Sequence, residues 1–230
     1  MEYISHPDFW VGLVKIIWIN IILSGDNAVV IALAARSLPP EQQRKAIMFG
    51  SGAAVVLRIV LTVVAAKLLE LSFLQIVGGC LLLWIGLQLL SGGGEEEGES
   101  KGTGTMAAAI RTILIADLVM SLDNVIAVAA TAGGNMLLLI LGLAISIPLV
   151  VFGSTLMIKL MERFPIIITL GAALIGWVAG ETVTSDSMLH DFVQANPWAH
   201  YAAAAIGAVF VVFVGKMLAA RSSRQSTVSS

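Results

Sequence analysis

The sequence predicts an all-α membrane protein with seven transmembrane helices, arranged as two inverted three-helix repeats plus a C-terminal seventh helix. Three observations predict this fold class. First, 58% of the residues are hydrophobic and only 12% are charged, with a mean hydropathy of +0.94, whereas soluble domains carry about 25% charged residues. Second, the apolar residues form continuous runs. Third, a polar motif occurs twice inside those runs.

The apolar runs are long enough to span a membrane as helices. A transmembrane helix needs about 20 mostly apolar residues, whereas the strands of a membrane barrel alternate in character over about ten. Because these runs are continuous, we expect helices. In chain order the predicted spans are 9–35, 46–67, 73–90, 107–132, 136–158, 165–181 and 199–218. The single cysteine, Cys80, excludes an internal disulfide.

The polar motif lies in the first span and again in the fourth. The first copy reads SGDN at 24–27 and the second reads SLDN at 121–124. An aspartate in the middle of a span costs about 2.5–3.5 kcal/mol on insertion scales, so two of them indicate a functional site. With a shift of 97 positions, four polar positions match: Asn20 with Asp117, Ser24 with Ser121, Asp26 with Asp123 and Asn27 with Asn124.

The similarity between the two halves continues beyond this motif. KLLE at 67–70 resembles KLME at 159–162, and Trp84 aligns with Trp177. Since the repeated unit contains three spans, an odd number, the second copy must enter the membrane in the opposite sense. Inverted repeats of this kind place substrate near the membrane midplane, between the two halves.

Composition divides the chain into four parts. Gly, Glu and Ser dominate SGGGEEEGESKGTGTM, a composition that favours a flexible acidic linker over a packed segment or a regulatory metal sensor. The parts are 1–90, the first three-helix repeat; 91–106, the linker; 107–181, the second three-helix repeat; and 182–230, an outer loop, the seventh helix and a cytoplasmic tail.

The distribution of Lys and Arg predicts the orientation of the spans. Cytoplasmic loops carry an excess of these residues. One side of the membrane receives ten Lys and Arg residues, whereas the other side receives only Lys67. Lys15 and Arg58 lie within spans. The rule therefore places the N-terminus outside and the C-terminus in the cytoplasm. The cytoplasmic residues are Arg36, Arg44, Lys45, Lys101, Arg111, Lys159, Arg163, Lys216, Arg221 and Arg224.

The two motif helices can present their polar side chains to one cavity if they pack antiparallel. Residues at i, i+4 and i+7 share a helix face, and Asp26 and Asp123 lie beside the two polar faces. Carboxylate, amide and hydroxyl oxygens suit hard cations such as Mg²⁺, Ca²⁺ and Mn²⁺. The alternative is hydrogen bonding that only holds helices together. The candidate metal ligands are Asn20, Ser24, Asp26, Asn27, Asp117, Ser121, Asp123 and Asn124.

Two further residues bear on such a site. Met120 could add a soft thioether ligand that favours Mn²⁺, although a buried methionine more often fills a gap in an apolar interior. Arg58, near the middle of its span, should pair with one of the carboxylates, since a buried charge needs a partner. It could be a counter-ion that yields to an incoming cation, or part of a static ion pair.

The quoted motifs resemble those of the TerC family of bacterial integral membrane proteins, with SGDNAVVIALA at 24–34 and DLVMSLDNVIAVA at 117–129. The chain is most similar to the short, YjbE-type branch of that family, and its organisation is similar to that of the LysE exporter superfamily. The resemblance implies Mn²⁺ export and a link to tellurite resistance. The family often has an acid ahead of SxDN in both copies; Asp117 matches it, whereas Asn20 replaces it here.

Together these observations predict a divalent metal cation transporter, with export of Mn²⁺ as the first choice, in the bacterial inner (cytoplasmic) membrane. We expect no enzymatic activity, no prosthetic group and no nucleic-acid partner; the expected partners are the transported metal ion and the lipid bilayer, and a homo-oligomer is left open. One alternative is a LysE-like exporter of a small organic solute, for which only Arg58 could bind a carboxylate. Another is a non-transport membrane enzyme or scaffold.

Overall fold

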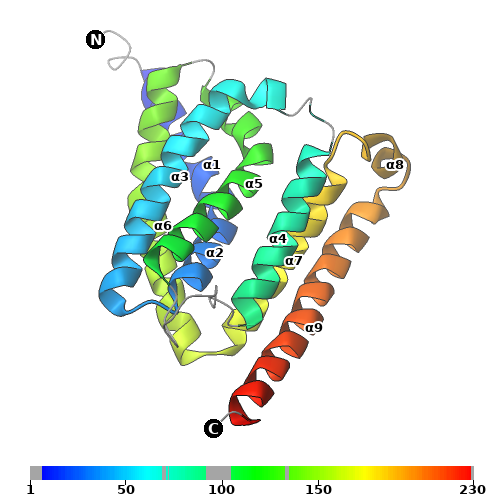
Figure 1. Ribbon diagram of the computed structural model, residues 1–230. Coiled ribbons are helices and arrows are strands. Elements are labelled where there is room, and N and C mark those ends of the chain that lie inside the picture. The colour runs from blue at the N-terminus through cyan, green and yellow to red at the C-terminus, as the bar shows by residue number, and fades with distance from the viewer. Residues whose placement is uncertain (1–6, 69–70, 72, 92–104, 133–134, 229–230) are drawn as a thin grey trace.

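The chain folds as a bundle of long helices in the computed structural model, which describes residues 7–68, 71, 73–91, 105–132 and 135–228 (Figure 1). These residues form nine helices and no strand. In chain order they are α1 Pro7–Leu23, α2 Gly25–Ala35, α3 Pro40–Leu68, α4 Leu74–Ser91, α5 Met106–Ala132, α6 Met136–Arg163, α7 Ile166–Thr184, α8 His190–Ala195 and α9 Trp198–Val228.

Six of the seven predicted spans match single helices, whereas the predicted span over 9–35 is interrupted within its length. The chain leaves the helical conformation at Ser24, with φ −112° and ψ 4°, so this region is two helices, α1 and α2. Five helices of the described chain are long and apolar enough to cross a membrane, namely α3, α4, α6, α7 and α9. The protein is therefore a multi-pass helical membrane protein, while the count of seven transmembrane helices stays a prediction.

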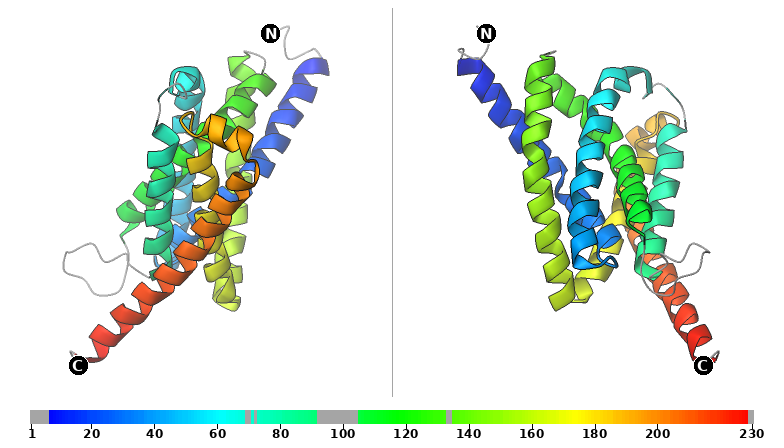
Figure 2. Two further views of the ribbon diagram at one scale, coloured as in Figure 1. Left: turned by 90° about the vertical axis from the view of Figure 1, so that its right-hand side faces the viewer. Right: turned by 60° about the vertical axis from the view of Figure 1, so that its left-hand side comes forward.

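Successive long helices run in alternating directions (Figures 1 and 2). Helix α3 packs along α5, and α1 packs along α6, so that α1, α2, α3, α5 and α6 form one group. Helices α4, α7 and α9 pack on one another beside it. Figure 2 shows that α9 runs at a tilt across the outside of α4 and α7.

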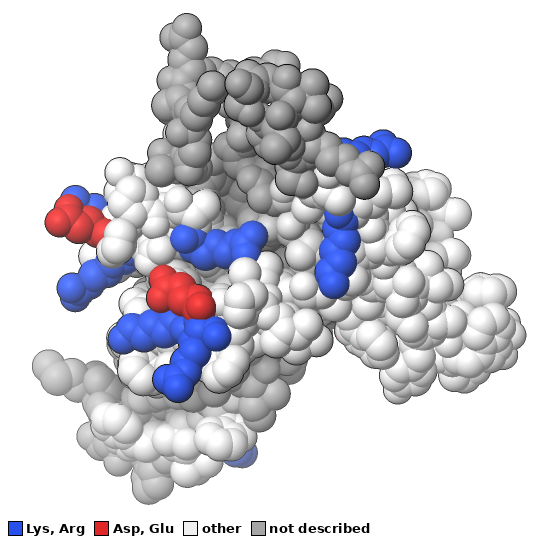
Figure 3. Space-filling model, turned by 90° about the horizontal axis from the view of Figure 1, so that it is seen from below, with Lys and Arg blue, Asp and Glu red and all other residues white. Residues whose placement is uncertain are grey.

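One end of the bundle carries most of the described basic side chains. Helices α3 and α5 begin at this end and α6 ends there, which brings together Arg44, Arg111, Lys159 and Arg163. Figure 3, a view onto this end, shows scattered Lys and Arg side chains that outnumber the acidic ones. The positive-inside rule predicts a cytoplasmic location for such an end, and the orientation stays a prediction. We refer to it below as the basic end.

Small residues let α7 and α9 approach closely. A Cβ atom added at Gly180 would meet the backbone of Ala203, and one added at Gly176 would meet the backbone of Gly207. Close backbone approach through residues spaced four apart is a common way for membrane helices to associate, because it maximises van der Waals contact.

Asp186 fixes the start of α4 from a distant part of the chain. Its buried carboxylate, just after α7, accepts hydrogen bonds from the backbone N–H groups of Phe73, Gln75 and Ile76, at 3.2, 3.1 and 3.4 Å. It also accepts one from Met188 at 3.0 Å. Phe73 has φ 69°, in the left-handed region that a bulky residue rarely adopts. The carboxylate therefore acts as an N-terminal cap that holds an unfavourable turn in place.

Candidate functional site

The site is built around the break between α1 and α2. Helix α2 begins at Gly25, so the polar residues of the first motif lie at a helix start rather than within a continuous helix. Because Ser24 lies at the break, Asn20, Ser24 and Asn27 do not share the face of one continuous helix. Gly25 is not needed sterically, because a Cβ added there meets nothing within 4 Å. Ser24 and Asn27 are both buried, at 5% and 3% exposure.

A buried ion pair joins α3 to α5 beside this break. Arg58 Nη2 donates to Asp117 Oδ1 at 2.5 Å, and Arg58 Nε donates to Ser121 Oγ at 3.0 Å. The Ser121 hydroxyl in turn donates to Asp117 Oδ2 at 3.3 Å. All three side chains are buried. The network satisfies both oxygens of the carboxylate, as a buried charge requires.

A small cavity lies against this ion pair, with a volume of about 20 Å³. A cavity needs about 10–15 Å³ to hold one water molecule, so the space suits one water-sized species. Four helices, α2, α3, α5 and α6, and the residue at the α1–α2 break supply its walls. The lining residues are Ser24, Asn27, Ile31, Ser51, Ala54, Val55, Arg58, Asp117, Ser146, Ile147 and Val150.

The side-chain amide of Asn27 lines the cavity without a hydrogen-bond partner. Neither its Nδ2 nor its Oδ1 atom bonds to another described group, although the side chain is buried. An unsatisfied buried polar group costs about 1–3 kcal/mol. Such a cost is expected where the polar group serves to contact a ligand.

The other predicted ligands divide into three groups. Asp26 is partly buried, and one of its carboxylate oxygens accepts from the backbone N–H of Asn27 at 2.8 Å. Asn124 is also partly buried, one turn beyond the Arg58 network on α5. The side chains of Asn20 and Asp123 lie outside the described residues, so their contacts are not described here. In the part of the chain that the structure describes, no three His, Cys, Asp or Glu residues come together as a metal cluster.

Met120 does not line the cavity. It is buried at 6% exposure in the main apolar core, together with Val29, Leu33 and Val119. This position fits the packing interpretation of Met120 rather than a ligand role.

Two residues of the cavity were missed by sequence reasoning. Ser51 on α3 and Ser146 on α6 both line it, and both are buried. No motif marks them, because a single serine in an apolar helix is common. Their position becomes meaningful only once α3 and α6 are known to face the α1–α2 break.

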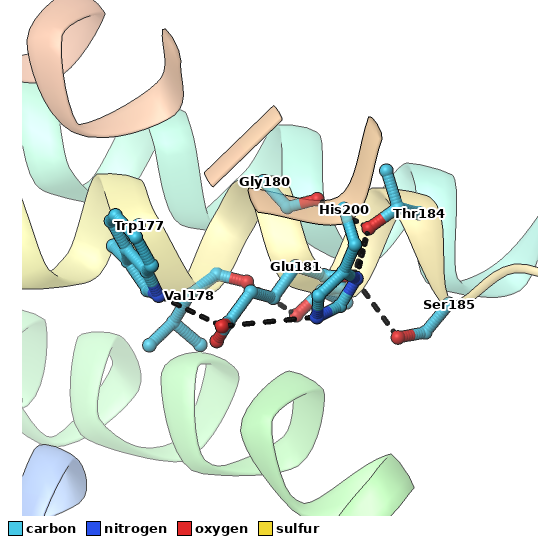
Figure 4. Close-up of polar contacts among 8 residues, drawn as sticks. Trp177, Val178, Gly180, Glu181, Thr184, Ser185 and His200 are labelled. Carbon is cyan, nitrogen blue, oxygen red and sulfur yellow. Dashed lines mark hydrogen bonds and ion pairs between the residues drawn. The ribbon is translucent and has the colours of Figure 1, made fainter. Parts of the chain in front are cut away.

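A second polar cluster links α7 to α9 at the end opposite the basic end (Figure 4). Glu181 accepts from Trp177 Nε1 at 2.8 Å and lies 3.8 Å from His200 Nε2. Thr184 Oγ1 lies within hydrogen-bond distance of His200 Nδ1, at 2.8 Å. The Glu181 and His200 side chains are about one-third exposed, so this cluster is a polar contact at the protein surface rather than an enclosed site.

Comparison with known proteins identifies the family. Residues 5–223 match the family model described as "Integral membrane protein TerC family". The "Uncharacterized membrane protein YjbE" of Bacillus subtilis is 42% identical over 189 residues, covering 82% of this chain and 86% of that protein. The "UPF0053 inner membrane protein YoaE" of Escherichia coli is 25% identical; the match covers 74% of this chain but 36% of YoaE. No solved structure matches the chain. The chain belongs to the TerC family of integral membrane proteins.

Proposed function

We propose that this protein is a secondary transporter of a divalent cation, with Mn²⁺ as the first candidate and export as the direction. The observation that carries the proposal is the cavity beside the Arg58–Asp117 pair, into which Asn27 presents an unpartnered amide. The carboxylate, amide and hydroxyl oxygens of its wall are ligands for hard cations. The motif aspartates Asp26 and Asp123 would supply further negative charge.

Arg58 has a defined role in this proposal. In the structure its guanidinium occupies the position beside Asp117 that a cation would occupy. A dication arriving at the cavity competes for the same carboxylate, so Arg58 acts as a built-in counter-ion that releases Asp117 to the cargo. This exchange avoids leaving a buried carboxylate without a positive partner, which would be costly at any stage of transport.

The cavity volume favours a metal ion over a small organic solute. About 20 Å³ accommodates one ion or one water, whereas an amino acid needs several times that space. Arg58 is the only described basic side chain that lines the cavity, and it is already engaged by Asp117. The LysE-like alternative therefore has less support from the site.

The helix packing supports the inverted repeat. A two-fold relation between 1–90 and 107–181 would exchange α1 with α5 and α3 with α6. The contact between α3 and α5 would then be equivalent to the contact between α6 and α1, and both contacts are present. Such an arrangement places the cavity between the halves, where transporters of this architecture hold substrate.

The test is a measurement of Mn²⁺ efflux from cells under Mn²⁺ stress, with cell-associated Mn²⁺ as the readout. We expect Asp26→Asn, Asp123→Asn and Asn27→Leu to lose efflux, because they remove charge or fill the cavity. A loss of even 1.4 kcal/mol in binding corresponds to a tenfold loss in affinity. Titration of the purified protein with Mn²⁺, Mg²⁺, Ca²⁺ and Zn²⁺ then gives the selectivity.

The matched control is Asp191→Asn, the same chemical change at an exposed position in α8. It should export like the unmodified protein. All variants must first be shown to insert and to purify as monodisperse protein. If Asp26→Asn, Asp123→Asn and Asn27→Leu all export normally, the cluster only holds helices together and the transport proposal is wrong.

A further inference from the structure

We propose that Ile47 and Ile158 form a hydrophobic gate between the cavity and the basic end, and that the Ser51 and Ser154 hydroxyls line the path directly above it. This inference rests on the proposed transport function, since it assigns the cytoplasmic access route to the same cavity. It predicts that cargo enters between α2, α3 and α6.

The first observation is that Ser51 and Ser154 do not use the partner that a helix offers them. Ser and Thr side chains in helices commonly donate to the carbonyl four residues earlier. Thr62, Ser146 and Thr155 do so here, at 2.7 Å each. Ser51 and Ser154 are as buried as Ser146, with exposures of 3%, 0% and 1%, yet their Oγ atoms have no partner among the described groups.

The second observation is where these two hydroxyls lie. Ser51 lines the cavity directly. Ser154 lies on α6 two turns beyond the cavity residue Ser146, toward the basic end. At Gly153, the residue before Ser154, α6 and α2 meet through small residues: a Cβ added there would lie 3.7 Å from the Cβ of Ala28. Unsatisfied hydroxyls beside a small-residue contact are what a polar route through an apolar bundle requires.

The third observation is an apolar layer on the cytoplasmic side of both serines. Ile47 precedes Ser51 by one helical turn, and Ile158 follows Ser154 by one turn. Because α3 starts at the basic end and α6 ends there, both isoleucines lie nearer the basic end than the serines. Both are buried, at 1% and 4%, and both belong to the main apolar core. Hydrophobic constrictions of this kind close pores by excluding water.

The gate can be tested by cysteine reactivity. The native cysteine is first removed by Cys80→Ala. Ser51→Cys and Ser154→Cys are then introduced one at a time into this variant. Inside-out vesicles then expose the cytoplasmic face to Ag⁺, a thiol-reactive cation small enough for a cavity that holds one ion. We expect both positions to react at least tenfold faster than Ala116→Cys. Ala116 is buried at 1% exposure in the same core, and it lies a similar distance from the start of its helix.

Opening the gate should raise these rates further. Adding Ile47→Ala or Ile158→Ala should accelerate labelling at Ser51→Cys at least tenfold and leave Ala116→Cys unchanged. Ile47→Val, which keeps most of the volume, should have little effect. Equal reactivity at all three cysteine positions, or no response to either alanine substitution, would overturn the proposal.

The same assay separates the gate from the identity of the cargo. If Mn²⁺ occupies the cavity, it should slow labelling at Ser51→Cys while leaving the response to Ile47→Ala in place. If Ile47→Ala accelerates labelling but Mn²⁺ does not slow it, the access path is supported and the Mn²⁺ proposal is contradicted. If Ser51→Cys is labelled only from the external face, the access path does not lead to the cytoplasm and the gate proposal is wrong.

Discussion

Arg58 on α3 and Asp117 on α5 form a buried ion pair, with 2.5 Å between Nη2 and Oδ1, and Ser121 bonds to both residues. This pair joins the two halves of the chain at the wall of the cavity. In the motif alignment Asp117 corresponds to Asn20, a residue type that carries no charge to pair with an arginine.

Asp117→Asn should destabilise the protein strongly. Removing one partner of a buried ion pair leaves the other charge uncompensated, at a cost of about 3–5 kcal/mol. Thermal unfolding of the purified protein in detergent measures the loss. The double variant Arg58→Gln/Asp117→Asn should recover most of it, because both charges are then gone. A double variant no more stable than Asp117→Asn alone would contradict a direct pairing.

Asn27→Ala should leave the stability nearly unchanged. The amide of Asn27 has no described partner, so its removal breaks no hydrogen bond and relieves the cost of burying a polar group. We expect a change within about 1 kcal/mol, or a small gain. The measurement is thermal unfolding of Asn27→Ala, compared with that of the unmodified protein and of Asp117→Asn. A loss as large as that of Asp117→Asn would mean that Asn27 is a structural residue.

Asp186 should stabilise the protein in a pH-dependent way. Burial raises the pKa of its carboxyl, whereas the four backbone N–H groups that donate to the carboxylate lower the pKa. Together the four hydrogen bonds outweigh burial, so the pKa lies below the usual 3.8. A depressed pKa in the folded state means that the stabilisation is complete above about pH 4 and is lost as the pH falls through the folded pKa.

The measurement is unfolding of Asp186→Ala between pH 7 and pH 3. Near neutral pH the variant should be less stable by about 2–3 kcal/mol, because four backbone donors lose a charged acceptor. Below pH 4 the difference from the unmodified protein should shrink. Asp191→Ala, at an exposed aspartate, is the control and should differ little at any pH. A difference that stays constant down to pH 3 would argue against the ionised cap.

Gly180→Ala should disrupt the contact between α7 and α9. The added methyl group would meet the backbone of Ala203, which cannot move aside as a side chain could. Overpacking of this kind costs about 1–3 kcal/mol or more. Gly153→Ala is the matched control, since its Cβ would lie at an ordinary 3.7 Å from Ala28. Thermal unfolding should separate the two variants, and equal stability would mean that α7 and α9 can shift apart without cost.

The helices were largely predictable from the sequence because hydrophobic run length determines them directly. The spans expected at 73–90 and 107–132 agree within a residue with α4 and α5. Gly25 in the first motif allows a local break but does not require one, so the sequence alone did not place the break at Ser24. The extra turns of α3, which begins at Pro40, were missed because its first residues are polar.

The candidate site was predictable only in part. The repeated motif pointed to Asp117, Ser121 and Asn27, and burial made a partner for Arg58 necessary, but which carboxylate pairs with Arg58 depends on how α3 and α5 pack. Ser51 and Ser146 carry no sequence signal at all. The capping role of Asp186 was also invisible, because its partners lie more than 100 positions earlier in the chain.

The distance along the chain between Asp186 and the helix start that it caps has a consequence for biogenesis. Phe73 and Asp186 are 113 residues apart. At about 5–20 residues per second, a ribosome takes roughly 6–23 s to synthesise that interval. During this time the turn at Phe73 lacks its acceptor, and the first three-helix unit waits in the bilayer for the second. A truncated chain that stops before Asp186 would never gain this acceptor, so the start of α4 would stay uncapped in it.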